Sequence, residues 1–289
     1  LHANAPPSDL KALDVPVQII KDKDQLAKLD DNLVFVLEPS FGCSADELSK
    51  TSYIFLHTPI YAGNHDLRGH RPLVPSRFMS NYWQKNTWFA GSSACNISTH
   101  RQRVLASSPA SPGNKVLFAG RPSVDKGIYT LFASMHFPSL QNREYQLTCV
   151  KTVNHPGGAD IIHSLYDAHP DITTVAAQPD IASMARLLAT QDVLVMPSAK
   201  NTGWIEAFGM LSVEAQHAGC RVVAANNGGL PETDCGGLIL VEPDNPQALA
   251  QGIATALDMG PLNSEERTKA ALHFTVQDSV KALRQAIKM

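Results

Sequence analysis

The sequence predicts an α/β protein built from two units, each with a parallel β-sheet between helices. Short, continuous apolar runs alternate with amphipathic helical stretches, which is typical of parallel sheets covered on both faces. The 289 residues exceed the size of one ordinary domain. A run of turn-forming residues at 107–114 (SSPASPGN) precedes a new strand and marks a seam. We therefore expect two domains, residues 1–111 and residues 112–289.

The strand-like runs are short and are separated by helical stretches. In chain order, strands are expected at 15–20, 33–37, 53–56, 115–119, 145–150, 193–197, 222–225 and 238–241. Helices are expected at 180–190, 212–218, 246–257 and, at the end of the chain, 274–287. No internal repeat or low-complexity tract interrupts this alternation.

The bulk composition fits a soluble enzyme and excludes few classes of protein. A net charge of −3 gives no general reason to bind nucleic acid. The five cysteines are odd in number and contain no C-x-x-C pair, so we expect reduced, mostly buried thiols and a cytoplasmic location. No apolar run approaches the ~20 residues of a membrane span, and the start shows no signal-peptide pattern. The chain begins with Leu1 rather than methionine, which leaves open a leader, a tag or an N-terminal segment upstream.

The first chemical signal is GRPSVDKG, which directly follows the strand expected at 115–119. Gly120 ends that strand, where ligands of open α/β sheets usually bind. Arg121 can meet a phosphate with two parallel hydrogen bonds, and Lys126 places a compact charge about one loop away. The alternative interpretation is a pair of solvated surface cations.

The second signal is EAFGMLSVE, in which Glu206 and Glu214 lie eight positions apart where a loop gives way to a helix. The unpaired amides and the dipole at a helix start attract an anion. The candidate residues for this contact are Phe208, Gly209, Met210 and Leu211, and the glycine lets the backbone approach closely. The alternatives are a favourable helix-start charge for Glu206 and an ordinary exposed helix position for Glu214.

A glycine pair and an acid close the series in NGGLPE, residues 227–232. In sequence order the chain thus carries two cations, two carboxylates around a helix start, and this turn. Cations and helix amides suit a diphosphate, whereas paired carboxylates suit the hydroxyl groups of sugars. Together they predict a site for a nucleotide-diphosphate sugar.

The motifs GRPSVDKG and EAFGMLSVEAQHAGCRVVAANNGGLPE, with the strand end Pro197-Ser198, resemble the family-four retaining glycosyltransferases. The resemblance covers the C-terminal domain almost end to end and includes the closing helix at 274–287. It implies the GT-B fold, in which two Rossmann-like domains with parallel sheets face a cleft. The E-x7-E element and the G-R…K-G element in this order make the resemblance specific.

The resemblance also implies roles for individual residues. Arg121 and Lys126 would neutralise the donor diphosphate, Glu206 would engage the transferred sugar, and Glu214 would bind ribose hydroxyls. Backbone amides of residues 208–211 would hold phosphate or sugar, and the segment 177–184 would lie near the nucleobase. The family uses no metal ion, and the nucleotide sugar is a substrate, so no metal or cofactor is expected.

The N-terminal third departs from the family pattern. No glycine-rich loop precedes Val15, and residues 1–111 are few for that domain, so it is either incomplete or a reduced version. FLHTP resembles the strand end whose histidine faces the reaction centre, which makes His57 a candidate site residue, with a packing or capping role as the alternative. Residues 74–76 followed by 77–82 resemble a later strand–serine–helix step. His65 and His70 could suggest a metal, but a solvated polar loop is the expected interpretation.

Residues 65–103 combine basic and aromatic side chains around a single acid, Asp66. The basic residues are Arg68, Arg71, Arg77, Lys85, Arg101 and Arg103, and the aromatic ones are Tyr82, Trp83, Trp88 and Phe89. Such a composition favours a phosphate-bearing or lipid-linked acceptor, or peripheral contact with an anionic membrane surface. The alternative, held equally, is that the aromatics are core and the arginines solvated.

The predicted function is transfer of a hexose-type sugar from a UDP- or GDP-linked donor to an acceptor hydroxyl, with retention and without a metal. The expected partners are the nucleotide sugar and a sugar or lipid-linked acceptor, and no nucleic acid. A nucleotide-sugar hydrolase or phosphorylase on the same fold is the enzymatic alternative, and a catalytically silent binding module is the other. A dinucleotide-dependent oxidoreductase is disfavoured because G-x-G-x-x-G is absent.

Overall fold

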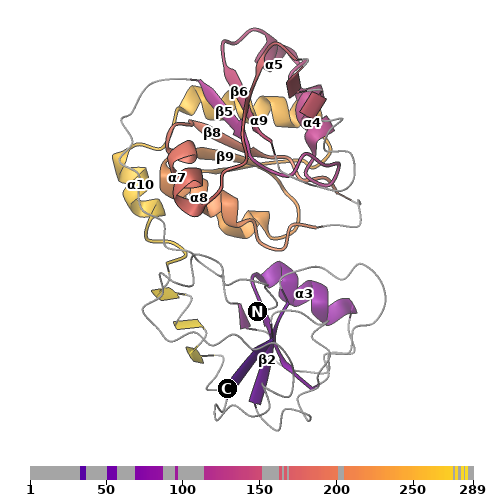
Figure 1. Cartoon of the computed structure of the whole chain (residues 1–289), viewed down its shortest axis with the longest axis vertical. Coiled ribbons are helices and arrows are strands. Elements are labelled where there is room, and N and C mark those ends of the chain that lie inside the picture. The colour runs from indigo at the N-terminus through magenta and orange to yellow at the C-terminus, as the bar shows by residue number, and fades with distance from the viewer. Residues whose placement is uncertain are drawn as a thin grey trace.

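The computed structural model contains two parallel β-sheets that are consecutive along the chain (Figure 1). The structure describes residues 33–36, 51–56, 69–86, 95–96, 114–151, 163–164, 166–167, 169–200, 205–275, 277–278, 281–282 and 284–285. The expected strand at 15–20 and the candidate His57 lie outside these residues. None of the helices within the described ranges has both the length and the apolar character that a bilayer crossing requires.

The first unit is built on a sheet whose strands follow in the order of the chain. Its elements are β1 (Leu33–Val36), β2 (Thr51–Phe55), β3 (Arg71–Val74), α3 (Arg77–Asn86) and β4 (Cys95–Asn96), with sheet order β1-β2-β3-β4. All three strand pairings are parallel. Met79 and Trp83, one helical turn apart, place the apolar face of α3 in the core. Trp83 is therefore a core residue, as the second interpretation of segment 65–103 expects for its aromatics.

The second unit carries a six-stranded parallel sheet. Its strands are β5 (Lys115–Phe118), β6 (Gln146–Val150), β7 (Ile172–Val175), β8 (Val193–Met196), β9 (Arg221–Ala225) and β10 (Leu238–Val241), in the order β10-β9-β8-β5-β6-β7. This is the doubly wound order 3-2-1-4-5-6 of dinucleotide-binding sheets. The chain direction across the sheet reverses between β5 and β8. That switch point is where such folds bind ligands, outside the carboxyl ends of the strands.

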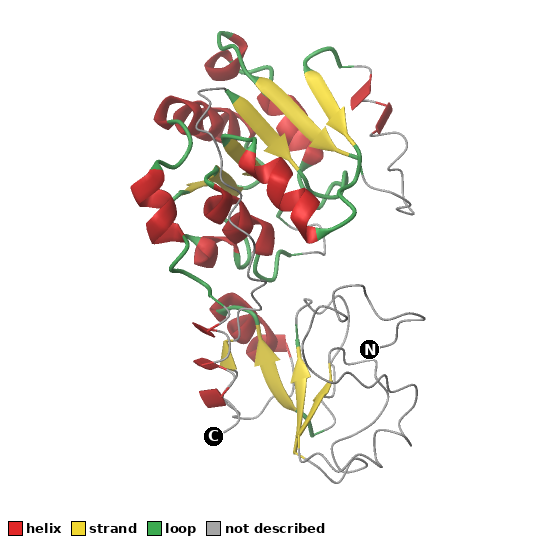
Figure 2. Ribbon diagram, turned by 60° about the vertical axis from the view of Figure 1, so that its left-hand side comes forward, coloured by secondary structure: helices red, strands yellow, loops and turns green. Residues whose placement is uncertain are grey.

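The helices of the second unit cover both faces of its sheet (Figure 2). Within the described residues, the helices with defined bounds are α4 (Ile128–Ser134), α5 (Pro138–Gln141), α7 (Ile181–Ala189), α8 (Met210–Ala218), the 3₁₀ helix η3 (Leu230–Thr233), α9 (Pro246–Met259) and α10 (Ser264–Ala270). Asp180, Asn245 and Asn263 cap α7, α9 and α10 with side-chain oxygens, which fixes where these helices begin.

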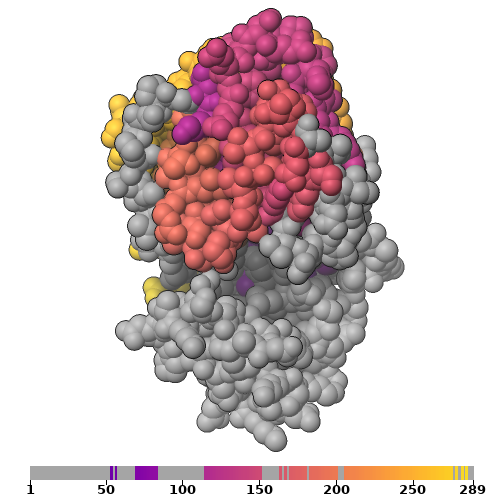
Figure 3. All heavy atoms as spheres, turned by 45° about the horizontal axis from the view of Figure 1, so that its top comes forward, coloured from indigo at the N-terminus to yellow at the C-terminus, as the bar shows by residue number. Residues whose placement is uncertain are grey.

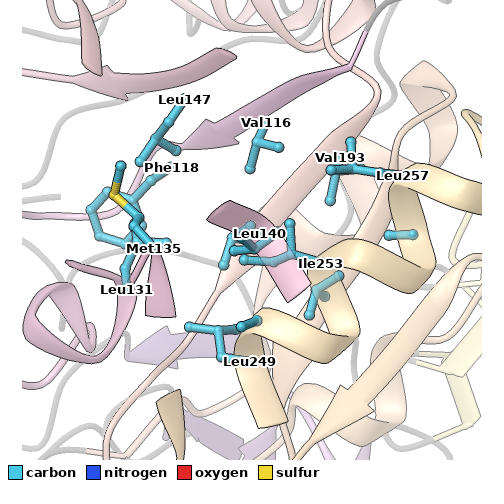
Figure 4. Packing of buried hydrophobic residues seen from close by; sticks show 14 of the residues in the cluster. Val116, Phe118, Leu131, Met135, Leu140, Leu147, Val193, Leu249, Ile253 and Leu257 are labelled. Carbon is cyan, nitrogen blue, oxygen red and sulfur yellow. The ribbon is translucent and has the colours of Figure 1, made fainter. Parts of the chain in front are cut away.

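Alternation along each strand divides the second core into two layers. Val116 and Phe118 of β5 point toward α4, α5 and α9, as the labelled side chains of Figure 4 show. Leu117, between them, packs with Leu188 of α7 and Ala215 of α8 on the opposite face. Because both faces are covered, the central strands β5, β8 and β9 are almost entirely apolar, which is why they could be predicted as continuous runs.

The observed strand bounds agree with the predicted ones within about two residues wherever both are described. The main omission is β7, whose sequence ITTV has two threonines and a half-buried pattern at the edge of the sheet. His70 was expected in a solvated loop, but it is buried directly before β3, so the expectation was wrong for this residue, whereas His65 lies outside the described residues. The exact domain boundary at 111 stays a prediction, because 97–113 lie outside the described residues.

Candidate functional site

The site begins with two loops that leave the carboxyl ends of β5 and β8, on either side of the switch point. The backbone amide of Ala199 donates to the carbonyl of Asp125 at 2.9 Å, which ties the second loop to the first. Gly127 has φ +73°, and a Cβ at this position would overlap the carbonyl oxygen of Pro197. Only glycine therefore permits this close approach. The two loops are held as one surface.

This arrangement brings a predicted cation and a predicted carboxylate together. Lys126 Nζ lies 2.6 Å from Glu206 Oε2, although 80 positions separate the two residues. Their side chains are only 17% and 14% exposed, respectively. In a largely desolvated pair of this kind each charge is compensated by the other, so removal of one partner leaves the other charge uncompensated. The ion pair bridges the switch point directly.

Arg121, the other predicted cation, has a different environment. Its Nη2 lies 3.3 Å from Asp125 Oδ2, four positions ahead on the same loop, and its side chain is 40% exposed. Arg121 thus lies at the rim of the same loop that carries Lys126. Gly120 precedes both cations in the sequence, directly after the strand, and a Cβ on it would lie 3.1 Å from Phe118 Cζ and 3.6 Å from Lys126 Cβ.

Helix α8 begins at the predicted place, with Gly209 as its N-cap residue at φ +98°. A Cβ on Gly209 would lie 2.6 Å from Leu230 Cδ2, so glycine is required by space as well as by backbone angle. Met210 is exposed and Leu211 half-buried. Phe208 is buried instead and packs edge-on against Phe274, with ring centroids 5.4 Å apart. Of these residues, Phe208 can reach a ligand only through its backbone.

The glycine turn 227–229 fixes the backbone of Glu206. Gly229 donates its amide to the Glu206 carbonyl at 2.8 Å. A Cβ on Gly228 would overlap that same carbonyl oxygen, and a Cβ on Gly229 would overlap the carbonyl of Ala207. The sequence identified this pair as a motif, and the structure supplies its physical reason. The backbone of this turn is thus in direct contact with the backbone of the loop that carries Glu206.

Glu214 lies about one turn into α8 and is 8% exposed. The alternative of an ordinary exposed helix position was therefore wrong. Beside it, Gln216 joins α8 to η3, because its Nε2 donates to the Thr233 carbonyl at 2.9 Å. Its Oε1 accepts from Cys235 N at 2.8 Å. This network holds together α8, η3 and the segment that follows η3.

Sequence analysis did not find that Glu232 and Ser76 connect the two units. Glu232 accepts hydrogen bonds from the backbone amides of Arg77 and Phe78, at 2.8 and 2.7 Å. Ser76 Oγ donates to the Ala207 carbonyl at 2.6 Å. Both Glu232 and the strand–serine–helix step were visible as motifs, but no local signal links them.

Three buried cysteines and one surface hollow lie outside this constellation. Burial raises the pKa of Cys149, Cys220 and Cys235 to about 12 each, so these three are the inert, reduced thiols that were expected. A hollow of ≈ 880 Å³ opens at the amino ends of β5 and β6, next to Lys115 and Gln146. Parallel sheets bind ligands at the opposite, carboxyl edge, so we place the site there.

In the space-filling view of Figure 3, the salmon to orange segments, which include α7 and α8, form one continuous face of the second unit. Two parallel sheets follow one another along the chain, and the second is doubly wound, with a cation–carboxylate pair at its switch point. This arrangement defines the fold class of the protein. The protein has the GT-B fold.

Residues 113–259, just over half of the chain, match the family described as Glycosyl transferases group 1, and the chain belongs to this family. The chain is 28% identical over 187 residues to D-inositol 3-phosphate glycosyltransferase of Paenarthrobacter aurescens (strain TC1), which covers 60% of this chain and 44% of that protein. The enzyme of that name from Streptomyces griseus subsp. griseus is 31% identical over 177 residues, covering 54% and 34%. The chain thus matches less than half the length of these curated relatives.

Solved structures share the fold at low sequence identity. Sucrose-phosphate synthase from Thermosynechococcus elongatus superimposes with a TM-score of 0.71 at 20% identity, covering 92% of this chain and 75% of that one. A glycosyltransferase from Rickettsia africae superimposes with a TM-score of 0.68 at 17% identity, and the match covers 92% of this chain and 78% of that one. Anabaena HepE in complex with UDP and glucose gives 0.65 at 17%, covering 89% and 78%.

Proposed function

We propose that this protein transfers a hexose-type sugar from a UDP- or GDP-linked donor to an acceptor hydroxyl, with retention of configuration. The observation that carries the proposal is the Lys126–Glu206 pair at the switch point between β5 and β8, in a chain of the group 1 glycosyltransferase family. The pair combines a cation suited to a phosphate with a carboxylate suited to sugar hydroxyls.

The donor diphosphate would be bound by exchange of partners. A phosphate oxygen near Lys126 Nζ competes with Glu206 for the ammonium group. Once the phosphate takes that place, the Glu206 carboxylate is available to accept hydrogen bonds from sugar hydroxyls. Buried charges need such compensation, so the diphosphate and the sugar would satisfy both partners together.

Departure of the nucleoside diphosphate develops negative charge on its leaving oxygen. Lys126, Arg121 and the amides at the start of α8 lie on the loops around the switch point, where they would stabilise that charge. The C1–O bond to the phosphate breaks while the acceptor oxygen bonds to C1 from the same face. The departing phosphate oxygen takes the acceptor's proton, so no separate base is required. No metal or other cofactor takes part in this scheme.

The acceptor would reach the donor from the first unit. The relatives named D-inositol 3-phosphate glycosyltransferase have names that specify a phosphorylated cyclic polyol. Arg71 and Arg77 of the first unit are exposed and suit a phosphate-bearing or lipid-linked acceptor. A peripheral contact with an anionic membrane through residues 65–103 and a cytoplasmic location remain part of the proposal. His57 is proposed as a site residue that faces the reaction centre.

Calorimetry with UDP, GDP and their hexose derivatives, followed by a turnover assay with a panel of hydroxyl acceptors, tests the proposal. We expect one nucleotide series to bind and its hexose derivative to be transferred with the α or β configuration unchanged. Donor hydrolysis without transfer to any acceptor would favour the hydrolase alternative. Binding with no turnover would favour a silent binding module, and no binding at all would overturn the proposal.

A further inference from the structure

We propose that Glu232 is a positioning residue that holds the first unit over the loop that carries Glu206, residues 205–209, here called the donor loop. This inference rests on the proposed function for its catalytic consequence and on the observed contacts for its geometry. Glu232 belongs to η3 in the second unit, whereas the amides that it binds belong to α3 in the first. Both cartoon views place α3 at the edge of the first unit that is turned toward the second (Figure 1, Figure 2).

The start of α3 is capped from both units. Ser76 Oγ accepts from the amide of Met79 at 3.0 Å, which is an ordinary N-cap within the first unit. The two preceding amides, of Arg77 and Phe78, donate one to each oxygen of the Glu232 carboxylate. The first turn of α3 contains no acidic residue of its own. Glu232 therefore supplies the anion that a helix start favours.

The glycine turn 227–229, which directly precedes η3, supports the donor loop. Gly229, three positions before Glu232, donates to the Glu206 carbonyl, and Ser76 of the first unit donates to the next carbonyl, that of Ala207. The contacts of α3 and of the glycine turn thus converge on two consecutive peptides. A shift of the first unit would be transmitted to the backbone that presents the Glu206 side chain to Lys126.

This connection has a specific consequence for catalysis. The residues proposed to bind the donor all lie in the second unit, so donor binding does not require the first unit to be in place. Transfer does require it, because the first unit brings the acceptor and excludes water from the reacting carbon. Releasing Glu232 from α3 should therefore favour hydrolysis over transfer without weakening donor binding.

The test compares Glu232→Gln and Glu232→Ala with the matched control Asp234→Asn. Asp234 lies two positions further along and also uses one carboxylate to accept from two backbone amides, those of Gly236 and Leu238 at 2.7 and 3.3 Å. All of its partners are in the second unit. The control thus removes the charge of a nearby carboxylate that also accepts from backbone amides, and it leaves the contact with α3 intact.

Three quantities should be measured for each variant: the dissociation constant of the donor nucleotide, the rate of donor hydrolysis, and kcat and KM for transfer. For the Glu232 variants we expect the ratio of transfer to hydrolysis to fall about tenfold or more, because small misplacements of reacting groups have effects of this size. Donor affinity should stay within about twofold, and Glu232→Gln should be milder than Glu232→Ala. Asp234→Asn should leave the ratio unchanged.

An equal loss of donor affinity and transfer in the Glu232 variants would show a merely structural role, and an unchanged ratio would also overturn the proposal. Amide hydrogen exchange at residues 77–79 provides a readout that does not depend on activity. It should accelerate in the Glu232 variants and not in Asp234→Asn. If the wild-type protein neither transfers nor hydrolyses a donor, the proposed function fails, while exchange still decides whether Glu232 holds α3.

Discussion

The buried floor of the site and its exposed rim use the same kinds of residues in opposite ways. On the floor, Lys126 and Glu206 come from distant parts of the chain and form a 2.6 Å pair that is largely shielded from water. At the rim, Arg121 and Asp125 are four positions apart, and the arginine is 40% exposed. Exposed ion pairs are worth little because water and salt screen them, whereas shielded ones are strongly coupled. The floor should therefore determine both stability and donor affinity.

The largest expected effect comes from breaking the floor itself with Gly127→Ala. The added Cβ would overlap the Pro197 carbonyl, and φ +73° is unfavourable for alanine. We expect a loss of about 3 kcal/mol or more of unfolding free energy, as for other backbone clashes at special angles. The measurement is chemical denaturation followed by circular dichroism.

Gly236→Ala is the control for backbone angle alone. Gly236 has φ +102°, but a Cβ there would have no neighbour within 4 Å. Its cost should be about 1–2 kcal/mol, the cost of the left-handed conformation for an L-residue. Equal destabilisation by the two substitutions would show that the contact between the β5 and β8 loops is not what requires glycine at Gly127.

The next prediction separates floor from rim by ligand binding. Lys126→Ala should weaken nucleoside-diphosphate binding by about 1.5–3 kcal/mol, the scale of a charged hydrogen bond, and leave the nucleoside nearly unaffected. Arg121→Ala should weaken nucleoside-diphosphate binding by about 1 kcal/mol or less, because the charge of Arg121 is already screened at the surface. Lys269→Ala, which removes an exposed pair with Glu265 on α10, is the control. An Arg121 effect as large as that of Lys126 would remove the distinction between the two regions.

A smaller and more selective effect should distinguish the two glutamates. Glu206→Ala removes the carboxylate that competes for Lys126, so nucleotide binding should be retained or slightly tightened while turnover falls. Glu214→Gln keeps the size of a buried side chain and removes its charge. This substitution should weaken the binding of UDP or GDP by about 1–2 kcal/mol, because the ribose hydroxyls lose a charged acceptor. Titration and steady-state kinetics that gave the reverse pattern would mean that the two roles are exchanged.

The sequence was sufficient to predict what depends on local pattern. The buried strands β5, β8 and β9 could be predicted because both faces are covered, whereas the edge strand β7, with its two threonines, has no such signal. Lys126 and Glu206 were each predicted as site residues. Their direct pairing was not, because it follows from β5 lying next to β8 in the sheet. The contact of Glu232 with α3 depends on how two sheets are placed, which no periodicity encodes.

The last prediction is that a chelator has no effect on the transfer reaction. In the proposed mechanism the charge of the leaving diphosphate is met by Lys126, by Arg121 and by the amides at the start of α8, so a divalent ion has no part left to play. Treatment with EDTA followed by desalting should leave kcat and KM unchanged, and Lys126→Ala should not be rescued by added magnesium or manganese. Activity that is lost with EDTA and restored by manganese would contradict this mechanism. It would mean that a metal ion, rather than the floor of the site, neutralises the diphosphate.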